Sequence, residues 1–104
     1  INLTDQSKVD LNEMFDLTII TLKQAIQSLS EMDRQAALEV IQKEKQIDQM
    51  ERSFRKKHII RLNEGVCEGP AGIVFVDILS NLERVGDHAV NIAEEVLGEK
   101  SSEE

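Results

Sequence analysis

Two pairs of carboxylates with the same spacing are the residues of this chain that are best suited to chemistry. Glu44 and Asp48 form one pair, and Glu83 and Asp87 form the other. Residues four apart lie on the same side of a helix, so the two acids of each pair repel one another unless a cation lies between them. Oxygen donors of this kind suit a divalent cation or a metal cluster. The spacing therefore indicates two candidate cation-binding pairs.

The first pair belongs to a face that is otherwise apolar. On a helical wheel, Glu44, Asp48 and Glu51 fall near the middle of the apolar arc of segment 33–63. Unpaired carboxylates on an inward face are unfavourable, so a cation is expected beside them. The sequence leaves three sources open: Arg84, a basic residue of a partner, or a metal ion. It also leaves open that the helix changes faces along its length.

The second pair lies beside a polar stripe of segment 71–98. A continuous polar stripe is usually the solvated side of an amphipathic helix. This one mixes Asp, Asn, Arg and His, whereas solvated helix faces are typically rich in Glu and Lys. Its members are Asp77, Asn81, Arg84, His88, Asn91 and Glu95.

Other chemistries find less support. Neither His58 nor His88 stands in a Glu-x-x-His or His-Glu-x-x-His pattern, which argues against di-iron and zinc-protease sites. A single cysteine, Cys67, forms no internal disulfide and no cysteine zinc site. Phosphotransfer through His58 or His88 is the remaining enzymatic alternative. We expect a protein that is not an enzyme, because no nucleophile, phosphate loop or catalytic metal motif is evident.

Three long helices must position these residues. The first 64 residues contain no proline or glycine, and apolar residues recur at three- and four-residue steps. We predict an all-α antiparallel three-helix bundle over 1–98, with helices at 9–29, 33–63 and 71–98 and an acidic tail at 99–104. Asp33 is the expected N-cap of the second helix, and Gly65 its left-handed C-terminal residue. The predicted core stripe of the first helix comprises Leu11, Met14, Phe15, Thr18, Leu22, Ala25, Ile26 and Leu29.

Composition restricts the possible partners. The 104 residues carry a net charge of −8 and only three aromatic residues, which disfavours nucleic acid. No apolar run approaches the roughly 18 to 20 residues that span a bilayer. A bundle this slender has a limited core, so association with another helical layer, such as homodimerisation, is expected. The start at Ile1 suggests an excised piece of a longer protein or a processed chain. The single cysteine indicates a reducing compartment.

The segment from Asn81 to Glu94, NLERVGDHAVNIAE, resembles the hallmark of the PhoU family of helical phosphate-regulation proteins. The stretch from Glu44 to Leu62 resembles the second helix of the same repeat. Arg61 to Cys67 and Phe75 to Arg84 are similar to the C-terminal cytoplasmic PhoU-like domain of bacterial sodium/phosphate cotransporter-type membrane proteins. The resemblance covers about residues 9–98.

The resemblance implies a regulatory or accessory domain of a phosphate-transport protein, at the cytoplasmic face of the membrane. Family members are three-helix repeats, commonly two per chain, so a single repeat implies a homodimer or docking on the transporter domain of the same polypeptide. Family metal motifs place candidate ligands for iron, zinc, nickel, manganese or magnesium on this chain. The alternative is a structural oligomerisation module without metal. The candidate ligands are Glu44, Asp48, Glu83 and Asp87, with Asp77 and Asn81 as further candidates.

Overall fold

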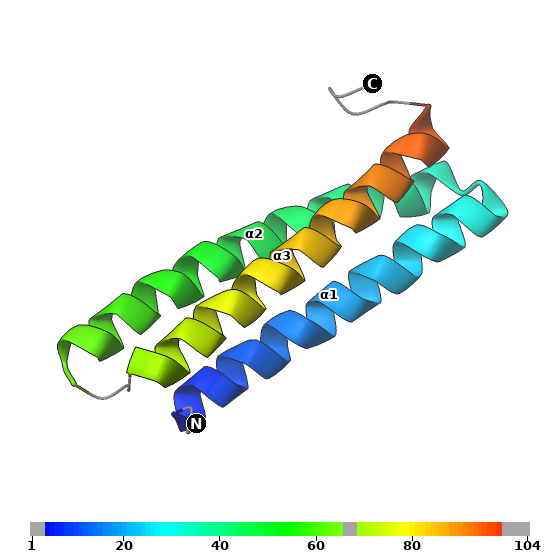
Figure 1. Cartoon of the computed structure of the whole chain (residues 1–104). Helices are drawn as coiled ribbons and strands as arrows, with labels where there is room; N and C mark the ends of the chain where they lie inside the picture. Colours follow the sequence, from blue (N-terminus) through cyan, green and yellow to red (C-terminus); the bar gives the residue numbers. More distant parts are fainter. Residues whose placement is uncertain (1–3, 66–68, 99–104) are drawn as a thin grey trace.

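Three long helices run side by side in an up-down-up bundle (Figure 1). The computed structural model describes residues 4–65 and 69–98, which contain α1 (Asp5–Glu31), α2 (Arg34–Asn63) and α3 (Gly69–Leu97) and no strand. The bundle measures 48 × 25 × 19 Å. The all-α prediction is confirmed; the second helix ends at the predicted residue, Asn63, and the other helix ends differ from the predicted ones by one to four residues. Cys67 and the predicted tail at 99–104 lie outside the described residues.

Local side-chain chemistry sets the helix ends. Thr4 accepts a hydrogen bond from the backbone N–H of Ser7 at 3.0 Å, which explains why α1 begins before residue 9. Asp33 accepts one from the N–H of Ala36 at 3.1 Å and is the N-cap of α2, as predicted. Gly65 has φ +72°, the left-handed conformation that favours glycine after a helix. The prediction that Gly65 is the left-handed C-terminal residue of the second helix is confirmed.

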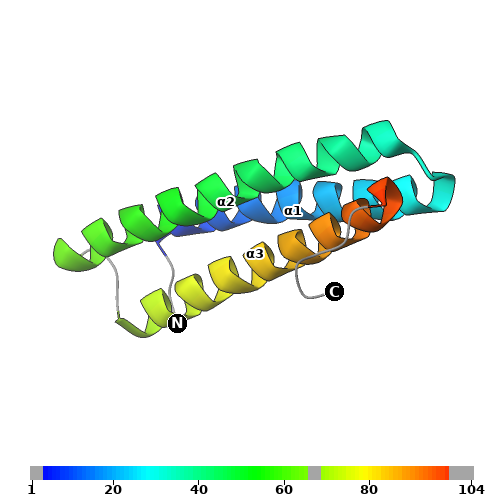
Figure 2. The same ribbon diagram turned by 90° about the horizontal axis from the view of Figure 1, so that it is seen from above.

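The core consists of two apolar clusters along the bundle axis. One lies near the α1–α2 turn and the other near the opposite end, where α2 leads towards α3 (Figure 2). Together they bury residues from all three helices, so each helix is held by both neighbours. The first cluster comprises Ala25, Ala37, Val40, Ala89, Ala93, Val96 and Leu97. The second comprises Met14, Ile47, Phe54, Phe75 and Leu79.

The predicted core stripe of α1 is partly wrong. Phe15, Ile26 and Leu29 are about half exposed. Small and hydroxyl-bearing residues take the inward positions, because a hydroxyl that donates to its own helix backbone is satisfied without water. Thr18 Oγ1, for example, donates to the Met14 carbonyl at 2.7 Å. The buried residues of α1 are Ser7, Asp10, Met14, Thr18, Thr21, Ala25 and Ser28.

Candidate functional site

Carboxylates from α2 and α3 meet along the groove between these two helices, which run antiparallel over their length (Figure 2). Glu44 of α2 faces Asp87 of α3, and one turn further along, Asp48 faces Glu83. Glu51 lies beside the second pair and is 6% exposed. We call these five residues the acidic cluster.

Gly86 of α3 packs against α2 beside the acidic cluster. A Cβ on Gly86 would lie 3.5 Å from Ile47 and 3.7 Å from the Glu44 side chain, which is ordinary contact distance. Ile47 and the Glu44 side chain therefore pack against the α3 backbone at Gly86, and a methyl group at this position would meet both without a clash. This packing positions Glu44 between its own helix and Asp87.

Mutual repulsion and burial change the acidity of the cluster. Glu83 has its pKa raised from 4.5 to about 7, first by a carboxyl hydrogen bond with Asp48, then by burial and by the charges of Glu51, Asp48 and Asp87. The pKa of Glu44 is raised by burial, by the charges of Asp48 and Asp87, and by a hydrogen bond with Asp87. The carboxyl hydrogen bonds that contribute to these shifts join Glu83 to Asp48 and Glu44 to Asp87, in each case an acid of α2 to an acid of α3.

The cations that pair with the cluster come from α2 itself. Arg55 forms an ion pair with Glu51, and its Nη2 also donates to Ser80 Oγ of α3 at 3.3 Å. Arg52 lies 3.6 Å from Asp48 and is largely exposed. Arg84, the intramolecular cation named from the sequence, is exposed instead. Among the described residues, no ion pair includes Glu44, Glu83 or Asp87. The cluster therefore keeps an excess of negative charge.

The donor set suits a hard cation, because every group in it is a carboxylate oxygen. Over residues 4–65 and 69–98, no three or more His, Cys, Asp and Glu side chains already converge in an arrangement that could hold a metal ion. The side chains stand instead as two pairs across the groove, Glu44 with Asp87 and Asp48 with Glu83. A cation would compensate the negative charge of these pairs, so the residues fit the charge of a metal ion without being prearranged around one.

The structure brings together four of the six ligands predicted from the sequence. Asp77 lies elsewhere, at the rim of a pocket near the end of the groove, and Asn81 is exposed. Glu51 is not among the ligands predicted from the sequence, although its i+7 spacing from Glu44 was the available signal. That spacing is one further step along the same helix face.

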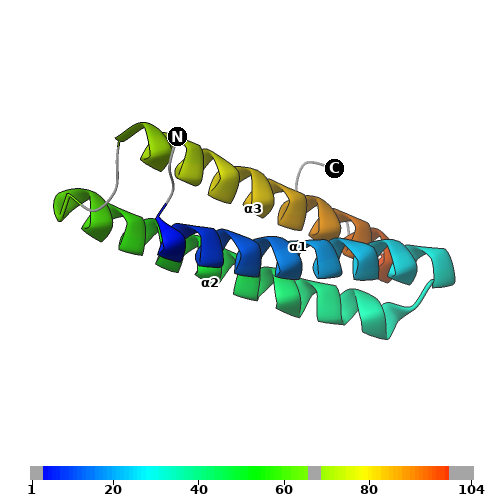
Figure 3. The same ribbon diagram turned by 90° about the horizontal axis from the view of Figure 1, so that it is seen from below.

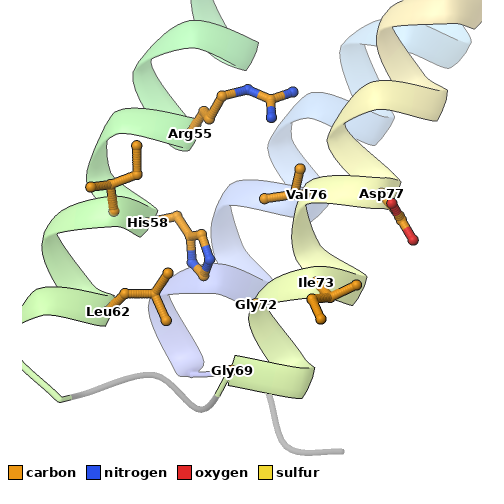
Figure 4. A pocket seen from close by; sticks show the side chains of 9 residues that line it. Arg55, His58, Leu62, Gly69, Gly72, Ile73, Val76 and Asp77 are labelled. Atoms are coloured by element: carbon orange, nitrogen blue, oxygen red, sulfur yellow. The ribbon is translucent and has the colours of Figure 1, made fainter.

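The end of the α2–α3 groove beyond the cluster is an apolar pocket of about 380 Å³ (Figure 4). His58 points from α2 towards α3 and is 2% exposed, with its ring 5.2 Å from that of Phe75. A Cβ on Gly72 would lie 2.6 Å from His58 Nε2, so only glycine allows this approach. Burial, and then the charge of Arg61, lower the pKa of His58. A buried imidazole of this kind is unsuited to phosphotransfer, whereas His88 is exposed.

An ion pair between Asp10 and Arg61 links α1 to α2 inside the bundle. Arg61 Nη1 lies 3.8 Å from Asp10 Oδ2, and both side chains are almost buried. Gln6 donates to Asp10 Oδ1 at 2.8 Å, and the guanidinium lies 5.5 Å from the centre of the Phe75 ring. The pair therefore fixes the start of α1 against the end of α2.

Comparison with known proteins agrees with this architecture. A family model described as the PhoU domain matches residues 11–96, and the chain therefore belongs to the PhoU family. Over 88 residues, or 85% of its length, it is 34% identical to the Phosphate-specific transport system accessory protein PhoU homolog 1 of Thermotoga maritima. The match spans 38% of that relative. No solved structure matches the chain.

In the part of the chain that the structure describes, no helix is both long enough and apolar enough to cross a membrane.

Proposed function

We propose that the chain is a regulatory or accessory domain of a phosphate-transport protein, that it is not an enzyme, and that it binds a metal ion at the acidic cluster. The observation that carries the cation proposal is the meeting of Glu44 and Asp48 with Glu83 and Asp87 in one groove. Membership of the PhoU family supports the link to phosphate transport. The name of the Thermotoga relative, an accessory protein of a phosphate-specific transport system, supports an accessory role.

The acidic cluster would hold the ion through carboxylate oxygens of both helices. A bound cation would neutralise the repulsion between the carboxylates of α2 and α3. This repulsion adds to burial in raising the pKa of Glu44, and to the hydrogen bond with Asp48 and burial in raising the pKa of Glu83. Magnesium, manganese and iron suit an all-oxygen donor set best, and zinc and nickel are the remaining candidates. The role of the metal is then to fasten the second helix to the third.

The location and partners follow from the same proposal. The motifs around Arg61 and between Phe75 and Arg84 resemble the cytoplasmic domain of sodium/phosphate cotransporter-type proteins. We place this domain at the cytoplasmic face of the membrane, in contact with a second copy of itself and with the transporter domain of the same polypeptide. Phosphate uptake by cells that carry the full-length protein with Glu83→Gln and Asp87→Asn tests this assignment. Unchanged uptake and unchanged regulation by phosphate would contradict it.

Metal analysis of purified protein tests the cation proposal directly. The chain is purified without chelator or affinity metal, and its metal content and thermal unfolding are compared with those of the Glu83→Gln/Asp87→Asn variant. A matched control is Glu13→Gln/Asp16→Asn, which removes two exposed carboxylates from α1. We expect metal and metal-dependent stabilisation in the parent and the control, and neither in the cluster variant. Equal metal content in all three proteins would overturn the proposal.

The second candidate function is a structural oligomerisation module without metal. Two observations favour it: the apolar residues of α1 that remain exposed, and the lack, within the described ranges, of a prearranged set of three ligands. This function predicts that each added metal raises the melting temperature of the parent and of the cluster variant by the same amount.

A further inference from the structure

The apolar pocket at the end of the α2–α3 groove has an exposed rim. The two helices spread apart towards this end of the bundle, where α3 begins (Figure 3). A Cβ on Gly69, which lines the pocket, would lie in open space. Ile59, at 52% exposed, borders the pocket from α2, and Ile73, at 67% exposed, borders it from α3. The pocket therefore continues into apolar surface on both helices.

The α2 edge of this pocket is basic. Segment 52–61 contains five lysine and arginine residues and no acid, in a chain whose net charge is −8. Arg52, Lys56 and Ile59 are exposed and follow one another at steps of four and three residues, so the two cations lie along the same edge as the rim isoleucine. Arg55 lines the pocket itself, and its side chain is 39% exposed. A ligand that covers the pocket from this edge therefore meets positive charge.

We propose that the pocket and its basic edge bind an amphipathic helix of a partner protein, whose apolar side chains fill the pocket and whose acidic residues lie along α2. This inference goes beyond the proposed function, and it depends neither on a metal ion nor on a homodimer. We call the pocket, together with the exposed residues Arg52, Lys56, Ile59 and Ile73, the docking groove.

The length of the pocket fits two turns of a helix. On α2 its lining runs from Arg55 to Leu62, which is about 10 Å at 1.5 Å per residue. Two apolar residues of a partner helix, at a step of three, four or seven residues, cover this distance, and helices bind apolar grooves through anchors of this spacing. A small molecule held in the pocket would leave Ile59 and Ile73 exposed to solvent, whereas a helix lying over it would cover both.

The buried part of the lining carries no charge, which suits apolar anchors. His58 and Gly72 are the buried residues among those that line the pocket. Burial, and then the charge of Arg61, lower the pKa of His58, so its imidazole is neutral at neutral pH. An apolar side chain that enters beside it gains buried area, whereas a charged group would lose its water. The acids of the partner helix therefore belong on the exposed basic edge.

The charges on the two edges favour a helix over a bilayer. Asp77 lies on the α3 edge of the pocket and is exposed, opposite the cations of α2. An anionic bilayer that covers both edges would meet Asp77 as well as Lys56, and the carboxylate would oppose its approach. A helix about 10 Å wide presents different residues to the two edges, so it places acids beside α2 alone.

Two exposed isoleucines provide a matched test. Ile73 lies on the rim of the docking groove, whereas Ile20 is 53% exposed on α1, which contributes no residue to the pocket lining. Ile73→Glu places a negative charge among the apolar anchors, and Ile20→Glu adds the same charge elsewhere. We expect Ile73→Glu to raise the dissociation constant of a partner helix by about 10-fold or more, and Ile20→Glu to leave it within about threefold.

Two exposed lysines of α2 test the basic edge in the same way. Lys56 lies on this edge, and Lys45 lies about 16 Å earlier along the helix. Lys56→Glu is expected to raise the dissociation constant by about 5-fold and to weaken its dependence on salt. Lys45→Glu is expected to leave both within about twofold.

The probe is a capped synthetic helix of about 15 residues, with leucines at steps of three and four residues and glutamates along one edge. A matched probe carries lysines in place of the glutamates. Titration followed by ¹⁵N nuclear magnetic resonance measures affinity and location together. We expect the glutamate probe to bind with a dissociation constant below about 1 mM and to shift the amide signals of Ile59, Leu62 and Ile73. The lysine probe is expected to bind about 10-fold more weakly or not at all.

Several results would overturn the proposal. They are no binding of the glutamate probe up to about 1 mM, equal binding of the two probes, and equal effects of Ile73→Glu and Ile20→Glu. Phosphatidylglycerol vesicles and sedimentation velocity of the chain alone test a membrane and a second copy as occupants. Vesicle binding or self-association that Ile73→Glu abolishes, with no binding of the glutamate probe, would assign the groove to that occupant instead.

Circular dichroism checks that each variant is folded. If Ile73→Glu does not fold, Ile73→Ser takes its place, and a dissociation constant at least about 3-fold above that of the parent is then expected. An unchanged dissociation constant for folded Ile73→Ser would also overturn the proposal.

Discussion

Replacing Glu83 by glutamine should stabilise the metal-free protein at neutral and higher pH. In the folded protein the pKa of Glu83 is about 7, against 4.5 for an ordinary glutamate. The folded state therefore holds a proton that the unfolded state releases. The stability from this proton is fully present below about pH 4.5 and is lost as the pH rises through about 7. Glutamine stays neutral at every pH, so the variant escapes this loss.

The size of the effect follows from the pKa shift. At about 1.4 kcal/mol per pKa unit, the full shift would correspond to about 3 kcal/mol. Glu83 is partly exposed, and solvent screens its interactions with Asp48, Glu51 and Asp87. We therefore expect Glu83→Gln to be more stable than the parent by about 1 to 2 kcal/mol at pH 8, or roughly 4 to 16 °C in melting temperature.

Thermal unfolding in the presence of EDTA measures this difference at pH 4.5 and at pH 8. The parent and Glu83→Gln should melt at nearly the same temperature at pH 4.5 and diverge at pH 8. The control Glu13→Gln removes an exposed carboxylate from α1 and so reports the effect of net charge alone. A variant less stable than the parent at pH 8, or a control that shows the same divergence, would refute the reasoning.

Three further substitutions test the packing and capping that position the site, each by chemical denaturation. Gly72→Ala should destabilise the protein by about 1 to 3 kcal/mol, because its Cβ would lie 2.6 Å from His58 Nε2; an unchanged midpoint would contradict the close approach. Gly86→Ala should be neutral or stabilising by up to about 1 kcal/mol, because its Cβ meets neighbours only at contact distance and alanine favours a helix. A large loss of stability would show that α2 and α3 lie closer at Gly86 than these distances indicate. Asp33→Ala should remove about 1 kcal/mol with the cap of α2, and Asp33→Ser should restore most of it.

The helices and the two acidic pairs of the site were predictable because they depend on short-range spacing. The steps of three and four residues identified three helices, and the i+4 spacing placed Glu44 with Asp48 and Glu83 with Asp87. The caps at Asp33 and Gly65 were equally local. Such features need no knowledge of how one helix lies against another.

The features that the sequence missed depend on how the helices pack. In α1, apolar character did not identify the buried residues, because Thr18 satisfies its hydroxyl on the Met14 carbonyl and Phe15 remains half exposed. The approach of His58 to Gly72 is likewise a contact between helices that no spacing along one helix reveals. Asp77 and Asn81 shared the polar stripe of α3, but their angle around the helix keeps them out of the acidic cluster.

The two sides of α3 carry different kinds of side chain. Glu83 and Asp87 face α2, whereas Val85 and Ile92 lie towards α1. A metal ion in the groove would hold α3 to α2 without touching Val85 and Ile92. If a second copy binds on the α1 side, any effect of the metal on the dimer must pass through α3 as a rigid element. A dimer dissociation constant that is the same with and without metal would show that the two surfaces are independent.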